Sequence, residues 1–258
     1  IIDDTLVEDQ ESVRVRMSDV VGAEVDEDQA DVYIHDNDEP PVPGTLQFAV
    51  SSVEVGENVG MLGIEVTRSG GSDGAVSALV RTRNGSARSG SDYLPLETRV
   101  NFADGDAATK TVFVSITDDA LDEDVEQFEL TLTGADGGAN IGDPDLMRVS
   151  IVDNDDPPAL SFVQASSIAS EADGIVHVIA RLSAPSGRAI YALYSLAGTA
   201  ELGVDYGLAS DRVYFAPGAT EHAIDIALVD DTRVEADETL IFSLQTPENA
   251  TLGEQRTH

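Results

Sequence analysis

A long internal repeat is the feature of this sequence that most limits its fold. A pair of adjacent Asp residues, followed by two Glu residues, recurs at spacings of about 115 and then 112 residues. The three pairs are Asp3-Asp4, Asp118-Asp119 and Asp230-Asp231. This period is far longer than the roughly 20–50 residues of a solenoid repeat. Each unit should therefore be a self-contained domain.

Three other motifs keep the same period and set the phase of the repeat. They are Leu46-Gln-Phe48 with Leu160-Ser-Phe162, Gly85-Ser-Ala-Arg-Ser-Gly-Ser-Asp-Tyr93 with Gly198-Thr-Ala-Glu-Leu-Gly-Val-Asp-Tyr206, and residues 35–41 with 152–158. The phase predicts that residues 1–39 are the last third of one unit and that 44–156 form a complete unit. Residues 159–258 should lack their final strand. We therefore expect residue 1 to lie in the middle of a longer protein.

Within the complete unit, short segments alternate between apolar and polar residues and are divided by Gly, Asp, Ser and Pro. Val112, Val114 and Ile116, for example, alternate with more polar neighbours, which is typical of strands with one buried face. The expected strands are 46–55, 61–67, 75–83, 98–102, 110–117, 126–133 and 146–152. Seven short strands in about 110 residues predict an all-β fold of tandem immunoglobulin-like, seven-stranded antiparallel β-sandwiches. Since Trp and Cys are absent, antibody-type domains are excluded.

The charge balance limits the partners of the chain. It has 49 Asp and Glu against 14 Lys and Arg, for a net charge of −35, which repels nucleic acid and anionic membranes. A halophilic surface or a disordered acidic tail would also be negative, but the acids here recur at fixed places in the repeat. The hydrophobic content of 41% also argues against disorder. No run of 18 apolar residues is present, so no membrane insertion is expected.

Strand order predicts that the acidic residues meet. In an antiparallel sandwich, the connections after the first, third, fifth and seventh strands lie at one pole. The carboxylates in or beside these connections are Glu57, Asp92, Asp118, Asp119, Glu123, Glu126, Asp153 and Asp155. Two unit charges about 4 Å apart interact by roughly 1 kcal/mol in water and about 4 kcal/mol at an effective dielectric of 20. Such a cluster needs cations, and hard oxygen ligands on loops favour several Ca²⁺ ions per complete repeat.

Each motif alone has a simpler interpretation. An Asp pair is usually a solvated turn, Gly-x-Asp-Tyr could be an Asx turn beside a packed Tyr, and Asp-Asn-Asp could be a polar linker. Their joint recurrence favours a metal site. Catalysis is not expected, because His35, His177, His222 and His258 share no recurring place beside Ser or Asp. The carboxylates also form one cluster instead of flanking a groove, as they would in a glycosidase.

These motifs resemble the Calx-beta domain, which is known from the regulatory region of sodium–calcium exchangers and from many large extracellular proteins. The resemblance rests on Gly56-Glu-Asn58, the Arg68-Ser-Gly-Gly turn, Gly85 to Tyr93, Asp118 to Glu126 and Asp153-Asn-Asp155. It implies that the eight carboxylates of the complete unit bind Ca²⁺. The Asn154 between the two closing Asp residues stands where an Asp is often found, which would lower the number or affinity of the ions. The segment Asp-Asn-Asp-Asp-Pro-Pro also resembles the linker of cadherins, another calcium-rigidified array, but the Gly-x-Asp-Tyr motif and the Asp-Asp…Glu…Glu loop do not belong to that family.

The resemblance extends to the two flanking units, whose sites would be incomplete. The implied ligands in the first unit are Asp3, Asp4, Glu8, Glu11, Asp36 and Asp38. Those in the last unit are Glu171, Asp205, Asp230, Asp231, Glu235 and Glu238.

We therefore expect a calcium-binding array in an extracellular or cell-surface protein, such as an adhesin or matrix protein. Calcium would stiffen the loops and the junctions between domains, where Pro-Pro pairs limit the hinge. Expected partners are Ca²⁺, the neighbouring repeats, and protein or glycan ligands at a cell surface. The alternative is a calcium-sensing regulatory module of a membrane transporter such as a sodium–calcium exchanger.

Overall fold

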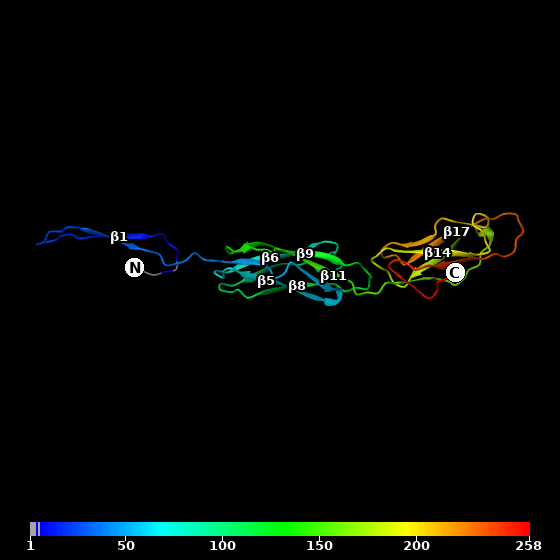
Figure 1. Ribbon diagram of the computed structural model, residues 1–258, viewed down its shortest axis with the longest axis horizontal. Coiled ribbons are helices and arrows are strands. Elements are labelled where there is room, and N and C mark those ends of the chain that lie inside the picture. The colour runs from blue at the N-terminus through cyan, green and yellow to red at the C-terminus, as the bar shows by residue number, and fades with distance from the viewer. Residues whose placement is uncertain (1–3, 5) are drawn as a thin grey trace.

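The computed structural model describes residue 4 and residues 6–258. Figure 1 shows a long molecule in which a hairpin and two β-sandwiches follow one another along the chain. The hairpin pairs β1 (Glu11–Arg16) with β2 (Gln29–Ile34) in antiparallel register. No helix in the described part of the chain is long and apolar enough to cross a membrane.

The first sandwich packs a four-stranded sheet, in the order β10-β3-β5-β8, against a five-stranded sheet, β4-β11-β9-β6-β7. Its strands are β3 (Thr45–Phe48), β4 (Ser52–Gly56), β5 (Met61–Ser69), β6 (Val76–Asn84), β7 (Glu97–Phe102), β8 (Lys110–Ser115), β9 (Glu126–Asp136), β10 (Asn140–Ile141) and β11 (Leu146–Val152). A 3-10 turn, η1 (Glu57–Val59), joins β4 to β5. The predicted all-β sandwich is confirmed.

The predicted first strand, 46–55, is wrong in one respect, because it is broken into two parts. Its first part, β3, pairs with β5, and its second part, β4, crosses to the other sheet. There β4 runs parallel to β11, and β10 runs parallel to β3, so the pairing is not purely antiparallel. An alternating sequence fixes which side chains face inward, but it does not record the sheet to which each half of a strand belongs.

The second sandwich repeats this plan with a five-stranded sheet, β15-β17-β13-β12-β19, and a three-stranded sheet, β16-β14-β18. Its elements are β12 (Ala159–Phe162), η2 (Glu171–Asp173), β13 (Ile175–Leu182), β14 (Ile190–Gly198), β15 (Tyr206–Leu208), β16 (Arg212–Phe215), β17 (Glu221–Leu228), β18 (Leu240–Leu244) and β19 (Thr251–Leu252).

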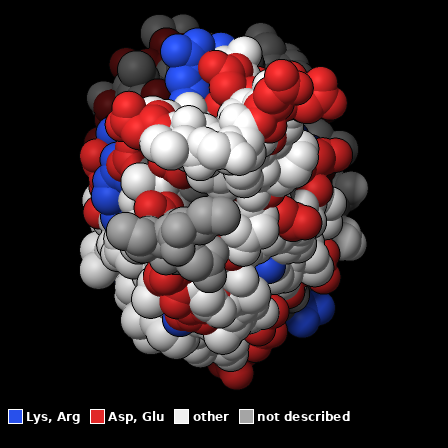
Figure 2. Space-filling model, turned by 90° about the vertical axis from the view of Figure 1, so that its left-hand side faces the viewer, with Lys and Arg blue, Asp and Glu red and all other residues white. Residues whose placement is uncertain are grey.

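Each sandwich has its own hydrophobic core, as the alternating patterns predict. In the first, Tyr93 and Phe128 stack with ring centroids 4.1 Å apart, and both side chains are buried. In the second, Phe162 and Phe242 make an edge contact. Both strands of the β1–β2 hairpin are exposed, apart from Ile34, which is half-buried. Seen along the chain from the hairpin end, Asp and Glu are much more frequent than Lys and Arg (Figure 2).

Candidate metal centre

The parallel pairing of β4 with β11 brings the first carboxylates of the candidate site together. Their register places Val152 beside Gly56, so the residues that follow, Asp153 and Glu57, leave the two strands side by side. Glu57 opens the η1 turn and is only 7% exposed. One carboxylate oxygen from each of Glu57, Asp153 and Asp155 lies within 4.8 Å of the others. These three residues form what we call the inner group.

A second set of carboxylates, the outer group, consists of Asp92, Glu123 and Glu126. One oxygen from each again lies within 4.8 Å of the others, and all three side chains are half-buried. Glu126 starts β9 opposite Ile151 of β11, so both groups lie at the same end of the sandwich. Residues of both groups line one pocket together with Asp124 and Ile151.

The Gly-x-Asp-Tyr motif holds Asp92 in this place. Tyr93 is buried against Phe128, and its hydroxyl donates a hydrogen bond to Oδ1 of Asn84 at 2.5 Å. The carboxylate of Asp92 accepts a hydrogen bond from the N–H of Arg88, which closes the loop. Gly85 is required because a Cβ there would lie 2.3 Å from the carbonyl oxygen of Gln127 in β9. The buried Tyr thus anchors a loop whose Asp faces the pole.

The β8–β9 loop, residues 116–125, is held from both sides. Glu57 Oε1 accepts a hydrogen bond from the N–H of Asp119 at 2.8 Å, and Asp119 Oδ1 accepts one from Leu121. Asp153 Oδ2 accepts a hydrogen bond from the N–H of Glu123 at 3.2 Å. These bonds join the loop to the ends of β4 and β11, far away in sequence.

Burial and crowding disfavour the ionised forms of these groups. Burial raises the pKa of Glu57 to about 7, and the nearby charges of Asp119, Asp153 and Asp155 add to the effect. Burial also raises the pKa of Glu126 to about 7, with Asp92 as the next cause. The pKa values of Glu123 and Asp155 are raised for the same reasons. Like charges are therefore concentrated at this pole.

The donor set fits Ca²⁺. Every side-chain donor in the two groups is a carboxylate oxygen, the ligand that hard cations select over zinc or copper. Oxygens that bind one Ca²⁺ at about 2.3–2.6 Å lie no more than about 5 Å apart, and both groups meet this limit. In addition, Oδ2 of Asp155 is buried and accepts no hydrogen bond from the described residues. A buried carboxylate oxygen without a donor is costly unless a cation satisfies it.

The predicted residues of the complete repeat thus separate into three sets. Six of them form the two groups, and Asp119 shapes the loop through backbone hydrogen bonds. Asp118 lies close enough to Asp155 for its charge to raise the pKa of that carboxyl. Asp122 and Asp124 belong to the same loop but were not among the predicted residues. Their position in the acidic run 118–126 was a usable signal.

The predicted ligands beside the hairpin make contacts equivalent to those of the complete unit. Glu8 donates its N–H to Asp36 Oδ2 at 2.8 Å, and Asp38 donates to Asp36 Oδ1 at 3.2 Å. The charge of Asp4 is the largest cause that raises the pKa of Glu8, and Glu11 is the next. Five of the predicted residues therefore lie together, while Asp3 is outside the described residues.

The predicted ligands of the last unit come together only in part. Burial and a hydrogen bond with Asp205 raise the pKa of Glu238, and Glu235 contributes through its charge. Glu171 opens η2 as Glu57 opens η1. No group of three close carboxylates is found among the described residues of 159–258. Asp230 and Asp231 begin an exposed loop, 229–239, in which Asp231 accepts a hydrogen bond from the N–H of Arg233.

Fold and site together define a tandem array of immunoglobulin-like β-sandwiches with acidic loops at the poles between successive repeats. The family model of the Calx-beta domain matches residues 41–155 and 153–256. The chain belongs to the Calx-beta domain family.

Several curated proteins are similar over most of the chain. The extracellular matrix organizing protein FRAS1 of Mus musculus is 31% identical over 97% of this chain and 7% of its own length. The FRAS1-related extracellular matrix protein 2 of Homo sapiens is 31% identical over 99% of this chain and 9% of its own length. Sodium/calcium exchanger 1 of Bos taurus is 27% identical over 78% of this chain and 23% of its own length. The chain therefore spans less than a tenth of the two matrix proteins.

One solved structure, the calcium binding domain CBD12 of CALX1.1, is similar to 81% of this chain and 82% of that chain. Its sequence identity is 21% and its TM-score is 0.43.

Proposed function

We propose that this chain is a calcium-binding structural segment of an extracellular matrix or cell-surface protein, with a binding and mechanical role and not a catalytic one. The observation that carries the proposal is the pair of carboxylate groups at one pole of residues 44–156. It is supported by the buried Asp155 oxygen, which accepts no hydrogen bond from any residue that the structure describes. The matrix proteins similar to nearly the whole chain support the extracellular assignment.

The proposed ions would act on both the loop and the junction. The inner group would hold one Ca²⁺ between the ends of β4 and β11, and the outer group would hold another between Asp92 and the β8–β9 loop. Because Asp153 and Asp155 lie just before Pro157-Pro158, with only Asp156 between, binding would also restrain the start of the linker. The predicted sites of the two flanking units, including Asp36, Asp38, Asp205 and Glu238, would bind more weakly because each set is incomplete.

The test is a calorimetric titration of the chain, freed of metal by a chelator, with CaCl₂ and in parallel with MgCl₂. We expect saturable heat with Ca²⁺ and a much weaker response to Mg²⁺, which keeps more water and fewer carboxylates. No heat with Ca²⁺ at about millimolar concentration would overturn the proposal, since extracellular modules bind at about 10⁻⁴–10⁻³ M.

A regulatory module of a membrane transporter is the second candidate, favoured by the similarity to the bovine exchanger over 78% of the chain. The same titration separates the two. Intracellular sensors bind Ca²⁺ at about 10⁻⁷–10⁻⁵ M, well below the range of extracellular modules. An affinity in the sensor range would favour the transporter module.

A further inference from the structure

The two sandwiches touch each other through a small polar contact beside the metal pole. Asp122, in the β8–β9 loop of the first sandwich, meets Ser186, in the turn between β13 and β14 of the second. The carbonyl oxygen of Asp122 accepts hydrogen bonds from Ser186 Oγ at 2.9 Å and from the N–H of Gly187 at 3.1 Å. Ser186 Oγ also lies 3.2 Å from Oδ2 of Asp122. Backbone and side chain of Asp122 are thus both engaged by the next repeat.

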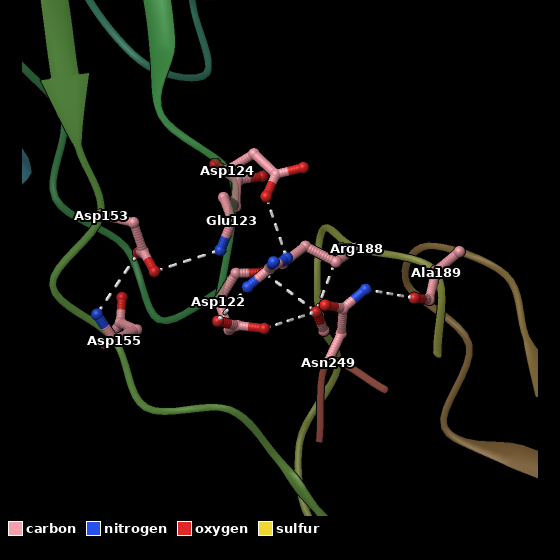
Figure 3. A network of polar contacts seen from close by, with 9 residues as sticks. Asp122, Glu123, Asp124, Asp153, Asp155, Arg188, Ala189 and Asn249 are labelled. Atoms are coloured by element: carbon pink, nitrogen blue, oxygen red, sulfur yellow. Dashed lines mark hydrogen bonds and ion pairs between the residues drawn. The ribbon is translucent and has the colours of Figure 1, made fainter. Parts of the chain in front are cut away.

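Ion pairs between the two repeats add to these hydrogen bonds. Arg188 lies between two carboxylates of the loop, with Nη1 3.5 Å from Oδ1 of Asp122 and Nε 3.1 Å from Oδ1 of Asp124. Figure 3 shows the Arg188 guanidinium between Asp122 and Asp124, with Asp153 and Asp155 across the loop from it. We call Asp122, Ser186 and Arg188 the clasp.

Burial distinguishes the clasp from a chance surface contact. Asp122 is 4% exposed and Ser186 is 1% exposed, although neither belongs to a hydrophobic core. A carboxylate removed from water is tolerated when it is hydrogen-bonded and paired with a cation. Ser186 and Arg188 supply both, and both come from the neighbouring repeat. The loop conformation that buries Asp122 therefore requires the second sandwich to be docked.

The second sandwich also prepares its own side of the contact. The N–H of Arg188 donates to Ser186 Oγ at 3.0 Å, and Asn249 Nδ2 donates to the carbonyl oxygen of Ala189 at 2.9 Å (Figure 3). The N–H of Gly218 donates to the carbonyl oxygen of Ser186. The turn is thus fixed within its repeat before it meets the preceding one, which lowers the entropy lost on docking.

The junction before residue 44 is built differently. Aligned on the Asp pairs, Val7 stands at the position of Asp122, and aligned on the first residues of β6 and β14, Gly74 stands at the position of Arg188. Here the corresponding turn binds its own linker: Asp73 Oδ2 accepts the N–H of Val42, and Arg68 Nε donates to the carbonyl oxygen of Pro43. In the same alignment Ser72 stands at the position of Ser186, so the serine is shared. The charged pair of the clasp, Asp122 with Arg188, is therefore particular to the junction between 44–156 and 159–258.

We infer that the clasp fixes the angle between the repeats 44–156 and 159–258 without a bound cation. Asp122 binds the following repeat, and the binding segment of that repeat is the turn that contains Ser186 and Arg188. This inference does not rest on the proposed calcium binding, because every contact that carries it joins two protein groups. Calcium bound at the pole of 44–156 would then order the loops and restrain the start of a linker whose angle the clasp already fixes.

The experiment measures the width of a distance distribution between two spin labels in a chelator. The chain has no Cys, so labels can be placed at exposed sites on the two repeats by Ala107→Cys and Ala209→Cys. We compare the otherwise native chain with Arg188→Glu and with the double variant Ser186→Ala/Arg188→Ala. The matched control is Arg212→Glu, a charge reversal within the second sandwich at an exposed ion pair with Asp211. A label pair within that sandwich, Ala165→Cys with Ala209→Cys, reports whether each variant is folded.

With chelator present, we expect a narrow distribution for the native chain and for the control. We expect a distribution at least about twofold broader for both clasp variants, because repeats without a firm interface move relative to each other. The inference is overturned if the native distribution in chelator is already as broad as that of the double variant, or if the clasp variants leave it unchanged. Calcium titration of the same samples is read separately, so a failure of calcium binding leaves this result standing, and the reverse also holds.

Discussion

The N–H of Glu123 donates a hydrogen bond to Oδ2 of Asp153 at 3.2 Å, and this bond ties the β8–β9 loop to the end of β11. An equivalent hydrogen bond, 2.8 Å long, runs from the N–H of Glu8 to Oδ2 of Asp36 beside the hairpin. The other oxygen of Asp153 accepts the N–H of Asp155. Each carboxylate oxygen keeps further lone pairs, so Asp153 can shape the loop and still bind a cation. The recurrence indicates that part of the site is shaped by the protein alone.

Replacing Asp153 should weaken calcium binding more than any change of charge at the opposite pole. Asp153→Asn removes a charge from the inner group and alters the acceptor that positions Glu123. We expect the dissociation constant for Ca²⁺ to rise by at least about tenfold, which corresponds to about 1.4 kcal/mol. Isothermal titration calorimetry of the whole chain measures this change.

Asp145→Asn is the matched control for that variant. Asp145 is exposed and precedes the same strand, β11, whereas Asp153 follows it. It therefore changes the net charge equally at the other end of the sandwich. Equal losses of affinity in the two variants would mean that calcium responds to the overall field and not to the predicted site.

Calcium binding should depend on pH near neutrality. Since the pKa values of Glu57 and Glu126 are raised to about 7, protons compete with Ca²⁺ for these carboxylates. For one such carboxyl, lowering the pH from 8 to 6 should weaken the apparent affinity by about tenfold. Titrations at pH 7 in two buffers of different ionisation enthalpy should show that binding releases protons. An affinity that is constant from pH 6 to 8 would contradict the assignment of these residues as ligands.

The same shifts set the sign of the pH dependence of stability in the absence of calcium. The folded chain holds protons on Glu57 and Glu126 up to about pH 7, whereas an unfolded Glu releases its proton near pH 4.3. Between these values the folded state binds more protons, so the free energy of unfolding falls as the pH rises. Thermal unfolding in chelator should therefore show a higher midpoint at pH 5.5 than at pH 8.

Glu57→Gln should separate stability from calcium binding. The amide oxygen can still accept the N–H of Asp119, but the charge that opposes Asp153 and Asp155 is removed. At pH 8 in chelator we expect a higher unfolding midpoint than in the native chain, and a smaller increase on adding calcium. Glu65→Gln, at an exposed position on β5, is the control and should change neither value. A lower midpoint in chelator would show that the repulsion at Glu57 is not important.

The fold class could be predicted from the sequence alone, because the apolar alternation of the strands and the repeat period of about 112 residues are both visible in a single chain. It also placed Glu57, Asp92 and Asp153 at one pole, since strand parity depends only on the number of strands. The split of 46–55 between two sheets was not predictable from alternation. That split matters, because the parallel pairing of β4 with β11 is what sets Glu57 beside Asp153.

The contacts between repeats could not be predicted from the sequence. Ser186 and Arg188 carry no motif, and nothing in a single repeat marks them as partners of Asp122. Their role depends on how two sandwiches dock, which is a matter of surface shape and linker length. The periodic motifs describe what each repeat needs for its own fold, so residues particular to one junction are absent from them.

The final prediction uses the close approach of Gly187 to Glu123. A Cβ at residue 187 would lie 2.4 Å from Oε1 and 2.7 Å from Cγ of Glu123, so Gly187→Ala must displace the Glu123 side chain. Glu123 belongs to the outer group with Asp92 and Glu126. We therefore expect a substitution in one repeat to weaken calcium binding in the preceding repeat by several-fold, measured by calorimetric titration of the whole chain.

Gly207→Ala is the control for this effect, because a Cβ there meets no atom closer than 3.9 Å. It adds the same methyl group to the same repeat without meeting Glu123, so calcium binding at the outer group should equal that of the native chain. An unchanged affinity in Gly187→Ala would mean that Glu123 binds Ca²⁺ equally well from another rotamer or is not a ligand. Combining Gly187→Ala with Glu123→Gln distinguishes these cases: if Glu123 carries the effect, the double variant should bind no more weakly than Glu123→Gln alone.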